Sequence, residues 1–282
     1  MDRLAAETAM GSVELLVRDL DAMTAYYADG VGLTVRSATG AEVVLGWQQD
    51  MVRLVQRSDL PDFSRGDAGL FHTAIVFATA ADLATAIAGV ARRYPRSFTG
   101  SADHLVSEAF YFDDPEGNGV ELYLDRPRSQ WQRTATGGVA MATNFLDPNT
   151  FLAEHLDESR DSGDSVVGHV HLQVGDIPTA EAFYADLLGF DVTARYGRQA
   201  LFVAAGGYHH HIGLNTWNSA GAGPRAASLG LAQLAIDVPT GDDLQSLELR
   251  LAKAGRPWQR RDETVYFADP WQTQIAVSAL TW

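Results

Sequence analysis

Two stretches far apart in the chain repeat the same pattern of residues. The segment 11–20, Gly-Ser-Val-Glu-Leu-Leu-Val-Arg-Asp-Leu, reappears at 168–177 as Gly-His-Val-His-Leu-Gln-Val-Gly-Asp-Ile. Each copy is followed by a helical segment, with Ala-Tyr-Tyr-Ala-Asp at 25–29 and Ala-Phe-Tyr-Ala-Asp at 182–186. Self-similarity on this scale indicates duplication, so we expect the chain to fold as repeated supersecondary units.

A second pair of repeats divides each half again. Gly-Leu-Phe-His at 69–72 corresponds to Gly-Leu-Ala-Gln at 230–233, and Tyr-Phe-Asp-Asp-Pro at 111–115 corresponds to Tyr-Phe-Ala-Asp-Pro at 266–270. The hydrophobic pattern of every unit indicates one strand, one helix and three further strands. We therefore predict an α+β fold of four modules, which start near residues 11, 70, 167 and 229.

The chain of 282 residues is long enough for roughly two domains of about 150 residues each. We predict a first domain at 1–125, with modules one and two, and a second at 167–282, with modules three and four. The segment 126–166 between them is predicted to be a linker with one short helix at 148–156. Connections of this length are uncommon unless they are linkers or functional segments.

Composition excludes several classes of partner. The formal net charge of −15 argues against nucleic acid and anionic membranes, which need clustered lysine and arginine. The chain has no cysteine, so it has no disulfide, no thiolate nucleophile and no cysteine-bound metal. The first residues lack an apolar signal segment, and no run approaches about 18 apolar residues, so we expect a cytoplasmic protein without a membrane span. The sequence leaves the oligomeric state open, a homo-oligomer included.

The sequence Asp-Pro-Glu-Gly at 114–117 predicts a tight turn, because Pro presets φ and Gly tolerates φ > 0. A short aromatic strand at 109–112 precedes it, and an alternating strand at 120–124 follows it, with Glu121 and Tyr123 on one face. A carboxylate that points into the interior of a sheet is costly unless it is paired or bound to a metal. The alternative is an ordinary hairpin with an exposed glutamate.

The spacing of His104, Tyr111 and Glu121 around this turn closely resembles the signature of extradiol ring-cleavage dioxygenases. These enzymes belong, with the glyoxalases, to the vicinal-oxygen-chelate superfamily. The sequence departs from the signature at Ala102, where the family prefers Gly, Asn, Thr, Ile or Val, a position without a functional group. Three further runs resemble the two-domain catechol 2,3-dioxygenase-like group, namely 103–109, 125–128 and 206–215.

The resemblance covers about residues 10–125 and 167–280. It implies that the four βαβββ modules form two half-barrels like those of glyoxalases and extradiol dioxygenases. It also implies a divalent metal held by two histidines and one glutamate. One histidine comes from the first strand of one module, whereas the other histidine and the glutamate come from the first and last strands of its partner module.

A facial set of two histidines and one carboxylate leaves positions open and suits Fe(II) and dioxygen, with Mn(II) or another divalent ion as the alternative. The positions that correspond to ligands are, in chain order, Ser12, His72, Glu121, His169, Gln233 and Ala276. Neither half of the chain carries a whole set, but the losses are complementary, because modules two and three together supply His72, Glu121 and His169. We therefore predict that module two pairs with module three around the metal, and module four with module one. The alternative is that each half pairs internally and that both sites are degraded.

The run His-His-His at 209–211 lies on a predicted strand and matches the family segment that carries the base for the catechol hydroxyl. The match places this base at His210, which on a strand would face opposite to its two neighbours. A slip of the match by one residue would select either neighbour instead. Histidine is suited to proton transfer near neutral pH. Tyr111 and His104 match family residues that hydrogen-bond oxygens of the substrate or of an intermediate.

The resemblance predicts a metal-dependent extradiol-type dioxygenase that uses dioxygen to cleave a catechol-like aromatic, as in aromatic compound catabolism. A second hypothesis is a glyoxalase-like isomerase or lyase, in which Glu121 is both ligand and base. A third hypothesis is a metal-free protein that binds or sequesters a small molecule on its concave sheet.

Overall fold

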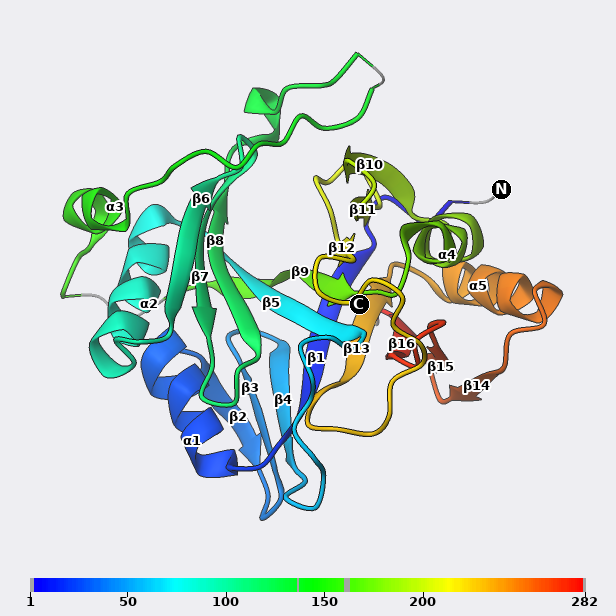
Figure 1. Cartoon of the computed structure of the whole chain (residues 1–282), viewed down its shortest axis with the longest axis horizontal. Helices are drawn as coiled ribbons and strands as arrows, with labels where there is room; N and C mark the ends of the chain where they lie inside the picture. Colours follow the sequence, from blue (N-terminus) through cyan, green and yellow to red (C-terminus); the bar gives the residue numbers. More distant parts are fainter. Residues whose placement is uncertain (1–2, 136, 160–162, 281–282) are drawn as a thin grey trace. The chain divides into compact units, whose positions relative to one another are not determined.

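The computed structural model describes residues 3–135, 137–159 and 163–280. Within these ranges the predicted pattern of one strand, one helix and three strands occurs four times, and each module begins within two residues of its expected start (Figure 1). The remaining parts of the predicted domains and linker, at 1–2, 136, 160–162 and 281–282, lie outside the described residues.

The first two modules have the same order of elements. Module one consists of β1 (Ala9–Val17), α1 (Leu20–Ala25), the π-helix η1 (Tyr26–Val31), β2 (Thr34–Ala38), β3 (Glu42–Gly46) and β4 (Asp50–Gln56). Module two consists of β5 (Gly69–Phe77), α2 (Ala80–Arg93), β6 (Phe98–Asp103), β7 (Ser107–Asp113) and β8 (Gly119–Asp125).

The second half of the chain repeats this order after a connecting segment. That segment contains the 3-10 helix η2 (Arg128–Gln130) and α3 (Pro148–His155), which confirms the predicted short helix. Module three consists of β9 (Ser165–Gln173), α4 (Ile177–Glu181), the π-helix η3 (Ala182–Leu187), β10 (Asp191–Tyr196), β11 (Ala200–Ala204) and β12 (Ile212–Asn215). Module four consists of β13 (Gly230–Val238), α5 (Gly241–Lys253), β14 (Trp258–Arg261), β15 (Thr264–Ala268) and β16 (Gln274–Ala279).

The strands of the described residues form two eight-stranded sheets. One has the order β14-β15-β16-β13-β1-β4-β3-β2 and combines modules four and one. The other has the order β10-β11-β12-β9-β5-β8-β7-β6 and combines modules three and two. The first and last strands of a module run parallel in module two (β5 and β8), module three (β9 and β12) and module four (β13 and β16). The predicted class, α+β with βαβββ modules in two half-barrel sheets, is confirmed.

The chain divides into two compact units. The N-terminal unit consists of Leu15–Leu60 and His72–Gly168. The C-terminal unit consists of the described residues of Met1–Glu14, Pro61–Phe71 and His169–Trp282. The division runs through β1, β5 and β9, so each of these three strands contributes residues to both units.

One long helix covers the core of the N-terminal unit. The helix α2 begins after Thr79, whose side chain accepts a hydrogen bond from the backbone N–H of Asp82 and so caps the helix. Its buried residues Leu83, Ile87 and Val90 follow the helical period and form one apolar face. The helix packs against β8, η1 and α3 (Figure 1).

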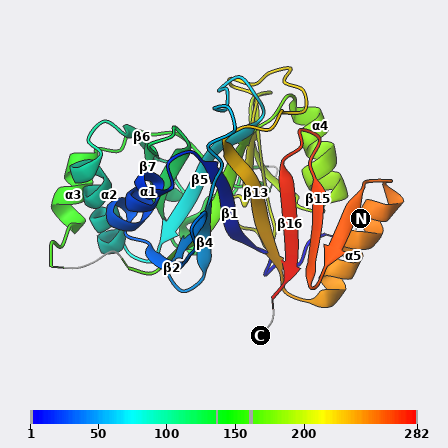
Figure 2. The same cartoon turned by 90° about the horizontal axis from the view of Figure 1, so that it is seen from below.

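The corresponding helix of the C-terminal unit is α5. Thr240 and Asp243 form a capping box at its start, in which each side chain bonds the backbone N–H of the other residue. Leu244, Leu247 and Leu251 are its buried residues. The helix packs against β13, β14 and β16, and Figure 2 shows it beside this sheet. Within the described ranges, none of the helices combines the length and the apolar character needed to cross a membrane.

Candidate metal centre

The strands β7 and β8 carry Tyr111 and Glu121 to the same row of their sheet. The strands pair antiparallel with Tyr111 directly opposite Glu121, so both side chains emerge on one face. The predicted turn at 114–117 is confirmed: Gly117 has a φ of 86°, and its N–H donates to the carbonyl of Asp114 at 2.9 Å. This turn fixes the register that brings the phenol and the carboxylate together.

Glu121 forms a buried pair with His72, which lies on the neighbouring parallel strand β5. His72 Nε2 lies 2.9 Å from Glu121 Oε2, and the two residues are only 6% and 2% exposed. A carboxylate removed from water in this way needs a partner or a cation to offset its desolvation. The predicted inward orientation of Glu121 is therefore confirmed, and the alternative of an exposed glutamate is wrong.

A hydrogen-bonded pair, Tyr111 and His104, adjoins this carboxylate. Tyr111 Oη lies 2.6 Å from His104 Nε2, and the ring of Tyr111 lies 5.6 Å from that of His72. Burial, and then the nearby charge of Glu121, raises the pKa of Tyr111 well above its usual value. The phenol therefore stays protonated and serves as a hydrogen-bond donor.

The tautomer of His104 follows from its second contact. His104 Nδ1 lies 2.7 Å from the carbonyl oxygen of Ala142. A carbonyl oxygen only accepts, so Nδ1 carries a hydrogen. In the neutral imidazole this leaves Nε2 as the acceptor for the hydroxyl of Tyr111.

The segment between the two halves of the chain holds His104 in place. Asn144 forms an antiparallel bridge with Asp103, next to His104. The guanidinium of Arg126 binds both carboxylate oxygens of Asp103, at 2.7 and 3.0 Å, and holds the pKa of that carboxyl below its usual range. Sequence reasoning missed Ala142, because it acts through a backbone carbonyl and every residue type offers one.

In the C-terminal unit, His169 lies among aromatic rings. It is 1% exposed on β9, and its ring centroid lies 4.1 Å from that of His210 and 5.8 Å from that of His209. The ring of His210 also contacts Phe202 of β11, at 4.9 Å between centroids. Of these two histidines, His210 thus lies closer to His169.

The prediction that the histidine run lies on a strand is wrong, because residues 209–211 form part of the loop between β11 and β12. Gly206 and Gly207, with φ of 59° and 70°, take the left-handed conformation just after β11 ends. This pair of glycines was the signal in the sequence that favours a loop. Because strand alternation does not apply there, His210 lies beside His209 and not on the opposite face.

His211 anchors this loop. Its ring atom Nδ1 accepts a hydrogen bond from the backbone N–H of Ala205 at 3.1 Å. The backbone N–H of His211 donates to the carbonyl of Val203 at 2.9 Å. Its ring packs 5.0 Å from Tyr208 and 6.3 Å from Phe190. His211 is therefore tied to the loop and to core rings.

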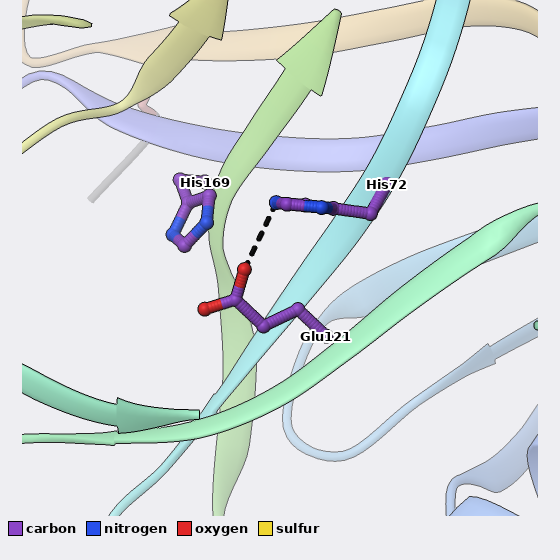
Figure 3. A group of neighbouring side chains, drawn as sticks. All are labelled: His72, Glu121 and His169. Atoms are coloured by element: carbon purple, nitrogen blue, oxygen red, sulfur yellow. Dashed lines mark ion pairs between the residues drawn. The ribbon is translucent and has the colours of Figure 1, made fainter. Parts of the chain in front are cut away.

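His72, Glu121 and His169 together form a group of neighbouring side chains that offers three metal-ligand atoms (Figure 3). These three atoms lie within 4.8 Å of one another, and all three residues are buried. Ligands that bind an ion at about 2.0–2.2 Å in adjacent positions are about 3 Å apart, which matches the 2.9 Å between His72 and Glu121. Two imidazole nitrogens and one carboxylate oxygen are the donors of the facial triad, so the residues present fit a divalent metal.

The corresponding positions of modules one and four carry no such donors. Ser12, Gln233 and Ala276 all belong to the C-terminal unit, on β1, β13 and β16. A hydroxyl, an amide and a methyl group supply neither an imidazole nor an anion for a divalent ion. The second set of equivalent positions is therefore unsuited to a metal.

Comparisons with known proteins agree with this fold. Residues 166–277 match the Glyoxalase/Bleomycin resistance protein/Dioxygenase superfamily. A catechol-2,3-dioxygenase from Bacillus subtilis (strain 168) is 36% identical over 284 residues, which cover 96% of each chain. A biphenyl-2,3-diol 1,2-dioxygenase 3 from Rhodococcus globerulus is 31% identical over 120 residues, which cover 39% of this chain and 60% of that protein.

Solved structures share the fold at lower identity. A putative dioxygenase from Bacillus subtilis has a TM-score of 0.63 at 12% identity and covers 99% of this chain and 86% of that one. Glyoxalase I from Zea mays has a TM-score of 0.60 at 16% identity and covers 97% of this chain and 92% of that one. The chain belongs to the glyoxalase/bleomycin resistance protein/dioxygenase superfamily, which confirms the resemblance found in the sequence.

Proposed function

We propose that the chain is a metal-dependent extradiol-type dioxygenase that cleaves the ring of a catechol-like aromatic with dioxygen. The observation that carries this proposal is the buried group of His72, Glu121 and His169, with the Tyr111–His104 pair beside it. The full-length similarity to a catechol-2,3-dioxygenase supports the choice of reaction.

The proposed metal is Fe(II), with Mn(II) or another divalent ion as the alternative. In our proposal module two supplies His72 and Glu121, and module three supplies His169. A divalent ion held by these three residues would keep open positions for ligands other than protein and would supply Lewis-acid chemistry, which lowers the pKa of a hydroxyl. Changing either histidine to alanine should remove stoichiometric metal if both are ligands.

We propose His210 as the base that receives the proton of the substrate hydroxyl. Its ring lies against that of His169, which is one of the three proposed metal ligands. The attachment of His211 to the loop favours His210 over that neighbour. A general base in this position typically contributes about 10²–10⁴-fold to the rate.

The Tyr111–His104 pair holds a hydroxyl group beside the carboxylate of Glu121. With His104 neutral, the hydroxyl of Tyr111 donates to Nε2 of His104. The same hydroxyl also lies within hydrogen-bond reach of Glu121, and in our proposal it turns to donate to an oxygen of the substrate. Donors held in place at a site of developing negative charge stabilise the transition state.

The test of the proposal is a ring-cleavage assay of the Fe(II)-loaded protein with catechol in ¹⁸O₂. We expect a yellow ring-opened product that carries two labelled oxygen atoms, with one O₂ consumed per product. Unchanged catechol with no uptake of O₂, for catechol and for ring-substituted catechols alike, would contradict the proposal. Protein treated with a chelator is the control.

A second candidate is a glyoxalase-like isomerase. It is favoured by the pairing of Glu121 with a histidine, since a carboxylate ligand can also act as a base, and by the shared fold of glyoxalase I from Zea mays. This reaction needs no dioxygen. Turnover of a hemithioacetal under anaerobic conditions, together with inactivity towards catechols in air, would select it.

A third candidate, a metal-free binding protein, requires that purified protein neither contains nor takes up a divalent ion.

A further inference from the structure

We propose that His209 is a positioning residue: its hydrogen bond to His210 keeps the ring proton of His210 on Nδ1 and leaves Nε2 as an acceptor. The inference rests on the proposed function, in which His210 is the base. It assigns a positioning role to a residue that the resemblance to dioxygenases offers only as an alternative base.

The two imidazoles are bonded directly to each other. His209 Nδ1 lies 2.7 Å from His210 Nδ1, and the ring centroids are 4.6 Å apart. His209 is fully buried and His210 is 8% exposed, so little water competes for this bond. A hydrogen bond between two ring nitrogens needs one donor and one acceptor, which couples the tautomers of the two rings.

Only one arrangement of this pair leaves His210 able to act as a base. If Nδ1 of His210 donates, its Nε2 keeps a lone pair, whereas if Nδ1 accepts, the hydrogen of a neutral ring is on Nε2. A general base has to present the lone pair to the proton that it receives. We therefore infer that Nδ1 of His210 donates and that Nδ1 of His209 accepts.

The backbone holds the two rings side by side. The carbonyl of His209 accepts a hydrogen bond from Thr193 Oγ1 at 2.6 Å. Thr193 lies where the pairing of β10 with β11 shifts register between Val192 and Ala194, and such a bulge redirects a side chain. The ring of Tyr208 packs on His209 at 4.1 Å between centroids. The position of His209 is thus set by contacts that do not involve His210.

The consequence for the reaction is a simple transfer of one proton. The O–H bond of the substrate hydroxyl breaks, and an N–H bond forms at Nε2 of His210. The resulting imidazolium still donates from Nδ1 to His209, as a charge-assisted hydrogen bond. The ring therefore keeps its orientation throughout the step.

The test reads the tautomer directly by ¹⁵N NMR of protein labelled at histidine and loaded with Zn²⁺, which is diamagnetic. The signals of His210 are identified by their loss in His210→Gln. We expect a protonated Nδ1 and an unprotonated Nε2 at His210 in the unaltered protein. In His209→Phe, which keeps a ring against Tyr208 but has no acceptor, the hydrogen should move towards Nε2.

A conservative variant and a kinetic readout complete the test. In His209→Asn the side-chain oxygen can take the place of Nδ1, so the tautomer of the unaltered protein should return. With Fe(II), kcat for ring cleavage should fall about 10–100-fold in His209→Phe with KM little changed, and it should recover in His209→Asn. His155→Phe, on α3, is the matched control.

Two results would overturn the inference: a hydrogen on Nε2 of His210 in the unaltered protein, or the same tautomer in His209→Phe as in the unaltered protein. Either result is obtained without any turnover. Failure of the proposed dioxygenase function is distinct, since it shows as absence of ring cleavage in the unaltered protein whatever the tautomer.

Discussion

Modules two and four share a turn but differ at the positions that correspond to metal ligands. In module two, Asp114 Oδ1 accepts hydrogen bonds from the backbone N–H groups of Glu116 and Asn118, at 3.0 and 2.9 Å, and Oδ2 accepts one from the hydroxyl of Tyr27 at 3.1 Å. The corresponding turn of module four repeats each contact. Asp269 accepts from the backbone N–H groups of Trp271 and Thr273, at 2.9 and 2.7 Å, and from the hydroxyl of Tyr184 at 3.0 Å.

The same two modules have diverged at the site. His72 and Glu121 of module two correspond to Gln233 and Ala276 of module four. The shared turn shows that the scaffold of a module forms whether or not its inner face carries ligands. The shared turn and the metal ligands are therefore independent features of a module. Substitution of a ligand should leave the turn intact, and substitution in the turn should leave the ligands in place.

The largest effect should come from removal of the carboxylate that only module two has. We expect Glu121→Ala to lose stoichiometric metal, because a facial triad has no second carboxylate to replace it. Gln233→Ala, at a ligand-equivalent position of module four, should bind metal like the unaltered protein. Metal analysis after dialysis checks both variants, and full retention of metal in Glu121→Ala would show that the ligands are misassigned.

The second largest effect should be a loss of turnover in a variant that still binds the metal. His210→Phe should keep the metal but lose about 10²–10⁴-fold in turnover, as expected for a missing general base. Steady-state kinetics and metal content are measured on the same sample. If this variant lost the metal instead, His210 would be a ligand, and if it turned over normally it would not be the base.

The shared turn predicts a dependence of stability on pH. Burial raises the pKa of Asp114 from 3.8 to about 7, and burial also raises that of Asp269. A raised pKa means that the folded state favours the protonated carboxyl. This contribution to stability is therefore fully present below about pH 4 and is lost as the pH rises through about 7.

The matched variant for this effect is Asp114→Asn, which cannot ionise. The quantity to follow is the difference in the free energy of unfolding, unaltered protein minus Asp114→Asn. This difference should fall between pH 4 and 7 by at most about 1.4 kcal/mol per pH unit. Urea unfolding of the metal-free proteins at several pH values measures this difference. A difference that stays constant over this range would contradict a buried carboxyl with a raised pKa.

The smallest effect lies at the one position where the two turns differ in backbone strain. Gly117 has a φ of 86°, and the corresponding residue of module four, Gln272, has a φ of 70°. Because a side chain is disfavoured in this conformation, Gln272→Gly should raise the free energy of unfolding by about 1 kcal/mol, and Gly117→Gln should lower it by a similar amount. Denaturant titration of both variants checks the pair, and equal stability of all three proteins would refute it.

Much of the fold followed from the sequence, because repeats and turns are local signals. The Asp-Pro turn at 114–117 and the helix from Pro148 were readable from residues adjacent in the chain. The candidate ligands followed from the family resemblance, and comparing the repeats showed that His72 and His169 occupy equivalent strand positions in different modules. Periodicity alone offered no means of choosing them from the other histidines.

The remaining features depend on contacts that a linear pattern does not record. The histidine run was mistaken for a strand because side-chain alternation was applied across Gly206 and Gly207, whose left-handed conformation ends β11. The contact of the Ala142 carbonyl with His104 joins residues 38 positions apart and depends on no particular side chain. The bond between His209 and His210 exists only because the loop breaks strand alternation.

The division of the chain has a consequence for its biosynthesis. The N-terminal unit is made of residues that have all been synthesised once Gly168 leaves the ribosome. The C-terminal unit needs the described residues of Met1–Glu14 and Pro61–Phe71, which are made early, together with those of His169–Trp282, which are made later. The two early segments can therefore pack into their unit only after more than a hundred later residues have been synthesised. Contacts between residues so far apart in sequence form slowly.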